Sequence, residues 1–130
     1  MVDGQAVLSC AATIGSLEGA EVVTIEGLSA GRSHPLQRAW SAEQVSQCGY
    51  CEPGMIMALA ALLKASPKPQ AAELAGIANI CRCGIGPRVL KAVRRASAAA
   101  ASAAPGRGEA ARRSSPLSNG SSGSEQDSTQ

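Results

Sequence analysis

The chain has 130 residues, about the length of one domain, and 45% of them are apolar but only 2% aromatic, with one Trp, one Tyr and no Phe. Because one aromatic side chain buries roughly 150–250 Å², a core without Phe is thin, and the five cysteines are the candidates for additional support. A net charge of +2 is too small to indicate a nucleic-acid-binding protein, and the longest apolar stretch, about nine residues at 55–63, is far shorter than the roughly 20 of a membrane span.

The N-terminal part of the chain predicts little regular structure. It has no basic segment followed by an apolar run, so a secretory signal is not expected and the thiols are expected to be reduced or metal-bound. Short extended segments are predicted at residues 7–8 and 22–25, with a loop of small residues around Gly15 and Gly19 between them.

Four short helices are predicted in the part that follows. Three begin near a proline, at Pro35, Pro53 and Pro87, a residue suited to the first helical turn. The other spans about residues 70–78. The apolar positions expected to face the core are Leu36, Ala39 and Trp40; Met55, Leu59, Leu62 and Leu63; Leu74 and Ile77; and Val89, Leu90 and Val93. Helices this short are marginal in isolation, so packing and the cysteines must stabilise them.

Two groups of polar residues in this part are interpreted as structural. His34, the only histidine, is expected to form a local hydrogen bond or to lie at the surface rather than to bind a metal. A run of basic residues without an acidic one is interpreted as a solvated helix face beside a partner or a cluster, because no aromatic residues for base stacking lie among them. These residues are Arg82, Arg88, Lys91, Arg94 and Arg95.

The sequence from Ala98 onward is predicted to be a disordered tail. Leu117 is its only large apolar residue, so it cannot bury enough surface to offset the entropy of ordering. Its Ala-rich start could extend the preceding helix by a turn or two.

Four of the five cysteines form two closely spaced pairs, in Cys48-Gly49-Tyr50-Cys51 and in Cys81-Arg82-Cys83. Each pair precedes a predicted helix, where free backbone N–H groups lower thiol pKa values and favour thiolate ligands. We expect each pair to place two thiolates within reach of one metal centre, with nearby glycines letting the backbone approach a bulky inorganic core. The unequal spacing favours a [2Fe–2S] cluster over zinc, with paired disulfides third, and leaves these alternatives open.

The sequence around these cysteines resembles the second iron–sulfur domain of the molybdenum hydroxylases, the xanthine dehydrogenase and aldehyde oxidase family. The similarity lies in residues 47–57, which read QCGYCEPGMIM, and in Asn79-Ile80-Cys81-Arg82-Cys83. Residues 23–28 and His34-Pro35-Leu36-Gln37 match the segment that precedes this domain in the family. The resemblance covers roughly residues 2–95 and is nearest to the small subunit of the isoquinoline oxidoreductase type.

The resemblance implies roles for particular residues. Cys48, Cys51, Cys81 and Cys83 would ligate a [2Fe–2S] cluster inside a small bundle of four helices. Gln47 and Cys83 match the positions that lie against the molybdopterin cofactor, which the large subunit holds. Electrons would pass from the molybdenum centre through this cluster to a second cluster, a flavin or a cytochrome. The expected partners are therefore the large molybdopterin-binding subunit and, beyond it, a flavin-binding chain or a cytochrome. The protein would be cytoplasmic, or periplasmic if exported with that large subunit.

The chain departs from the family at its N-terminus. Family members carry a plant-type ferredoxin-like domain there with four cluster cysteines, and only Cys10 matches one of them, the fourth. We therefore expect Cys10 to be a free or buried thiol, and the chain to be a truncated gene product, a product of a misplaced start or a relic.

These observations predict a mainly α fold in three parts. Residues 1–30 would be the remnant of a β-grasp ferredoxin-like domain with a linker, residues 31–97 the helical [2Fe–2S]-binding domain, and residues 98–130 the disordered tail. The predicted function is that of an electron-transfer subunit of a molybdenum-containing hydroxylase that oxidises aldehydes or N-heterocycles. The alternatives are a stand-alone structural or regulatory module that binds zinc or a single cluster, and a non-functional relic.

Overall fold

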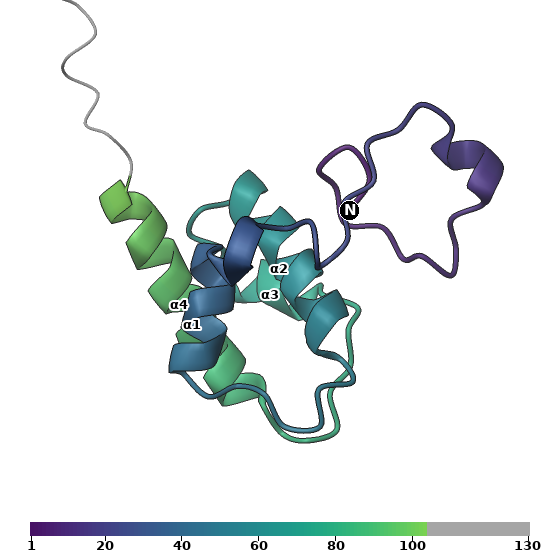
Figure 1. The fold of residues 1–130 in the computed structure, drawn as a ribbon. Helices are drawn as coiled ribbons and strands as arrows, with labels where there is room; N and C mark the ends of the chain where they lie inside the picture. The colour runs from purple at the N-terminus through teal and green to yellow at the C-terminus, as the bar shows by residue number, and fades with distance from the viewer. Residues whose placement is uncertain (104–130) are drawn as a thin grey trace, which may run out of the picture.

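The computed structural model describes residues 1–103, and this part of the chain is mainly helical (Figure 1). Two short 3₁₀ turns, η1 (Ile14–Leu17) and η2 (Ala30–Arg32), precede the four α-helices. The helices are α1 (Pro35–Ala42), α2 (Glu52–Ala65), α3 (Ala71–Ala75) and α4 (Gly86–Ala103). The prediction of a mainly α fold with four helices is confirmed.

Helix α1 begins where the sequence predicted, at Pro35. The Nδ1 atom of His34 accepts the backbone N–H of Leu36 over 3.2 Å and so caps the helix. The expected local hydrogen-bonding role of His34 is thus confirmed. Leu36, Ala39 and Trp40 form the buried side of the helix, as predicted.

Helix α2 begins directly after Cys51, with Pro53 in its first turn. Glu52 near its N-terminus and Lys64 near its C-terminus both suit the helix dipole. Its fully buried side chains are Met55, Ile56, Leu59 and Ala60.

Helix α3 is shorter than the predicted span of residues 70–78. Gln70 and Glu73 form a capping box at its start, and the helix ends at Ala75, followed by Gly76, whose N–H bonds back to the carbonyls of the last turn. Ile77 follows the helix and still packs against the core from the loop. The apolar spacing of Leu74 and Ile77 therefore indicated burial correctly but did not indicate a continuous helix.

Helix α4 packs chiefly against α1, and the two run side by side in Figure 1. Its buried side is made of Ala92, Val93 and Ala96. The prediction that Leu90 faces the core is wrong, because 41% of its side chain is exposed. The Ala-rich residues 98–103 extend α4 to Ala103, as considered from the sequence. The rest of the predicted tail, residues 104–130, lies outside the described residues.

The N-terminal residues form a loop that projects from the helices in Figure 1. The predicted extended segments form no strand within residues 1–103; only isolated bridges join Val2 to Gln5 and Val2 to Val22. A two-stranded pairing without further strands is marginal in water, and Val7 and Leu8 lie exposed. None of the helices in the described part is long and apolar enough to cross a membrane.

The core of the helical part is small and contains a single aromatic residue, Trp40. Partly buried Cys51 and Cys81 pack against its edge. The loops that carry these two cysteines therefore extend the core on one side. The structure confirms the thin core that the composition predicted.

Candidate metal centre

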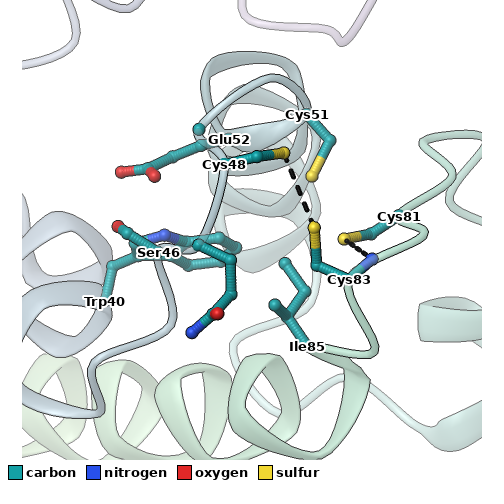
Figure 2. Close-up of a pocket in the computed structure, with 10 residues that line it drawn as sticks. Trp40, Ser46, Cys48, Cys51, Glu52, Cys81, Cys83 and Ile85 are labelled. Atoms are coloured by element: carbon teal, nitrogen blue, oxygen red, sulfur yellow. Dashed lines mark hydrogen bonds between the residues drawn. The ribbon is translucent and has the colours of Figure 1, made fainter.

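The two cysteine motifs lie on two loops at the same end of the helical part. Cys48 belongs to the loop between α1 and α2, and Cys51 is the last residue before α2. Cys81 and Cys83 belong to the loop between α3 and α4. These four cysteines line one small cavity, and Figure 2 shows their sulfur atoms turned toward one another. The structure thus brings together all four cysteines that the sequence singled out.

One sulfur–sulfur contact joins the two motifs. The Sγ atom of Cys83 lies 3.6 Å from that of Cys48, and the thiols of Cys51 and Cys81 shift each other's pKa. This contact sets the first cysteine of one motif against the last cysteine of the other. The expectation that each motif places two thiolates within reach of one metal centre stays a prediction.

The hydrogen bonds among these cysteines shift their pKa values in opposite directions. The backbone N–H of Cys83 donates to the Cys81 sulfur over 3.4 Å and is the main reason why the pKa of Cys81 is lowered. Partial burial raises the pKa of Cys51, and the neighbouring Cys81 thiol raises it further. The pKa of Cys83 is raised chiefly by its hydrogen bond to Cys48. The Cys83 thiol donates to the Cys48 sulfur, and a bound metal would replace the proton of this thiol as it would those of its other ligands.

Glycines follow both members of the closest sulfur pair. Gly49 has a φ of 80° and Gly84 a φ of 71°, so both lie in the left-handed region that side chains disfavour. An added Cβ would meet no atom within 4 Å at either position. The left-handed backbone is one reason for glycine at these two positions, and the predicted close approach of the backbone to an inorganic core stays a prediction. Space matters at Gly54, where a Cβ would lie 2.8 Å from the Asn79 side-chain nitrogen.

The remaining candidate residues lie in different places. Gln47 is exposed and lines the cavity beside Cys48. Cys10 is exposed on the N-terminal loop and does not line the cavity. Trp40 is a neighbour of the site that the sequence pattern did not reveal: it lines the same cavity, only 2% of it is exposed, and its buried Nε1 atom has no hydrogen-bond partner within the described residues. Its position eight residues before Cys48, at the end of α1, was the available signal.

The donor set fits a [2Fe–2S] cluster. Four cysteines from two loops line one cavity, and four thiolates are the ligands that such a cluster takes. A structural zinc ion takes the same ligands.

Comparison with known protein families matches residues 24–94 to the [2Fe-2S] binding domain. The chain belongs to this family. It is 49% identical over 102 residues to the alpha chain of isoquinoline 1-oxidoreductase from Brevundimonas diminuta, an alignment that covers 77% of this chain and 67% of the relative. It is 43% identical over 100 residues to one of the subunits of nicotinate dehydrogenase from Pseudomonas putida, covering 75% of this chain and 64% of that relative.

The structure of this [2Fe–2S] family member also resembles a solved one. Quinoline 2-oxidoreductase from Pseudomonas putida 86 matches with a TM-score of 0.68 and 31% sequence identity, over 78% of this chain and 65% of that chain. The chain spans about two thirds of the length of these three proteins. The family expected from the sequence is confirmed.

Proposed function

We propose that this chain is an electron-transfer subunit of a molybdenum-containing hydroxylase that oxidises aldehydes or N-heterocycles. The observation that carries the proposal is the meeting of two cysteine motifs at one cavity, with the Cys48 and Cys83 sulfurs 3.6 Å apart. Support comes from relatives named as subunits of isoquinoline 1-oxidoreductase and nicotinate dehydrogenase.

In this proposal Cys48, Cys51, Cys81 and Cys83 ligate a [2Fe–2S] cluster. When bound, the cluster supplies one-electron transfer. The chain holds it between two loops, and the backbone N–H of Cys83 donates to the Cys81 sulfur. Such hydrogen bonds to ligand sulfurs stabilise the added negative charge of the reduced cluster and so raise its reduction potential.

The surface around the cysteines is the proposed docking face for a large molybdopterin-binding subunit. Cys48 and Cys83 are exposed on it, and two apolar side chains beside them are almost fully exposed, Tyr50 at 94% and Ile80 at 84%. Exposed apolar groups of this size favour a partner that covers them. Gln47 and Cys83 would then lie toward the molybdopterin cofactor of that partner, and a second cluster, a flavin or a cytochrome would accept the electrons.

The test is the metal content of the full chain, purified without oxygen. About two iron and two acid-labile sulfide per chain, with visible absorption of the oxidised protein, are expected for a [2Fe–2S] cluster. One zinc per chain and a colourless protein would contradict the proposal and would instead support a structural zinc module.

A further inference from the structure

The loop that leads to Cys48 begins with a strained residue. Helix α1 ends in a Schellman motif, in which the N–H of Val45 bonds to the Trp40 carbonyl and the N–H of Gln44 to the Ser41 carbonyl, both over 3.1 Å. The residue between helix and loop in this motif is usually glycine, because it adopts a left-handed conformation. Here it is Gln44, with a φ of 48°. The turn that directs the chain toward Cys48 therefore requires Gln44 to adopt a backbone conformation that residues other than glycine disfavour.

Arg88 of α4 contacts this turn directly. Its Nη1 atom donates to the carbonyl oxygen of Gln44 over 3.0 Å. Arg88 lies in the first turn of α4, where the helix dipole disfavours a positive charge. The hydrogen bond from Arg88 to the Gln44 carbonyl, 44 positions away in the sequence, offsets this unfavourable interaction with the helix dipole.

The contact closes a ring around the closest pair of sulfurs. From Gln44 the chain runs four residues to Cys48, whose sulfur touches that of Cys83, and from Cys83 it runs five residues to Arg88. Within this ring Val45 and Ile85 are anchored in the core. The distance between Cys48 and Cys83 thus depends on two chain segments, which the Arg88–Gln44 hydrogen bond joins and which Val45 and Ile85 attach to the core.

We propose that Arg88 is a positioning residue for the cluster: by holding the Gln44 carbonyl, it keeps Cys48 in reach of Cys83. The inference rests on the proposed [2Fe–2S] site. It assigns to Arg88 a role apart from that of the other basic residues of α4, which the sequence had grouped together as one solvated face.

The test compares Arg88→Met, which keeps most of the apolar stem but removes the donors, with Arg95→Met in the full chain. Arg95 is the matched control, because it lies on the same helix and reaches the neighbouring Glu43, but through an ion pair of 2.8 Å with its side chain and not through the backbone of the turn. The measurements are the rate of cluster loss to a chelator, the electron paramagnetic resonance spectrum of the reduced cluster, and helix content. For Arg88→Met we expect cluster loss about three- to tenfold faster, as for one lost hydrogen bond, and an altered spectrum at unchanged helix content. Arg95→Met should match the wild type.

Two further variants separate positioning from general packing. Arg88→Lys retains a cationic donor and should recover part of the retention. Gln44→Gly removes the strain of the left-handed residue, so Arg88→Met should have a smaller effect in that background. Equal cluster loss in Arg88→Met and Arg95→Met, or wild-type retention and spectrum in Arg88→Met, would overturn the inference. A wild-type chain that binds no iron would instead contradict the proposed function itself.

Discussion

The sulfur atoms of Cys48 and Cys83 lie 3.6 Å apart, although the two cysteines are 35 positions apart in the chain. This contact joins the loop before α2 to the loop before α4. Because Cys51 and Cys81, which shift each other's pKa, lie on the same two loops, the arrangement of all four thiols depends on how the loops approach each other. The thiol site is therefore a product of the tertiary fold as much as of the motifs.

The first prediction concerns the ligand set. Changing Cys81 or Cys83 to Ser should abolish or severely weaken cluster retention, because each removes one of four thiolates. Changing Cys10 to Ser should leave the cluster intact, since Cys10 is exposed on the N-terminal loop and does not line the cavity. Iron content and visible absorption measure the effect. Equal loss in all three variants would show that Cys10 is a ligand.

The second prediction concerns the glycines after the closest sulfur pair. Gly49→Ala and Gly84→Ala should each destabilise the chain by about 1 kcal/mol, because a side chain in the left-handed region is strained. Gly86→Ala is the control: it begins α4, its Cβ would meet nothing within 4 Å, and its φ is not positive. Urea unfolding at equal iron content measures the differences. A Gly86→Ala effect as large as that of Gly49→Ala would refute the backbone explanation.

The third prediction tests the corrected orientation of α4. Leu59→Ala should cost about 2–5 kcal/mol of unfolding free energy, because Leu59 is only 1% exposed and its loss leaves a cavity. Leu90→Ala should cost well under half as much, because Leu90 is 41% exposed. Thermal or urea unfolding of both variants measures the two losses of unfolding free energy. Similar costs would mean that Leu90 packs in the core after all.

The fourth prediction concerns the pH dependence of stability through His34. Burial lowers the pKa of His34 in the folded chain, while its Nδ1 atom accepts the N–H of Leu36 only in the neutral form. The unfolded chain, with its ordinary value near 6.5, therefore binds the proton first as the pH falls. The stabilisation is complete above that value and is lost as the pH decreases from it toward the lowered folded value.

A series of melting temperatures between about pH 7.5 and pH 5 measures this loss, since the ordinary His pKa lies within that range. His34→Asn is the control, because Asn is a good N-cap that does not titrate, and the chain has no other histidine. Its melting temperature should fall less over the same range. Parallel curves for the two proteins would exclude a contribution from His34.

Local signals in the sequence determined much of the fold and the identity of the candidate site. Prolines located the starts of α1, α2 and α4 because a fixed φ suits the first turn wherever it occurs. The spacing of four cysteines before two helices indicated a thiolate metal site, and the resemblance of the surrounding residues indicated the family, which the comparison confirmed. All of these depend on residues that are close together in the chain.

Only the tertiary structure decided which sulfurs meet, which face of α4 is buried and what supports the loops. Cys48 pairs with Cys83, and Arg88 reaches Gln44, through approaches that span 35 and 44 positions. Leu90 has helical spacing with Val93 but is 41% exposed, whereas Ala92, Val93 and Ala96 are buried. Apolar periodicity indicates that a helix has a buried face, but the neighbouring helix decides which residues at its margin are covered. For the same reason, spacing identified the four thiols and the approach of two loops decided how they pair.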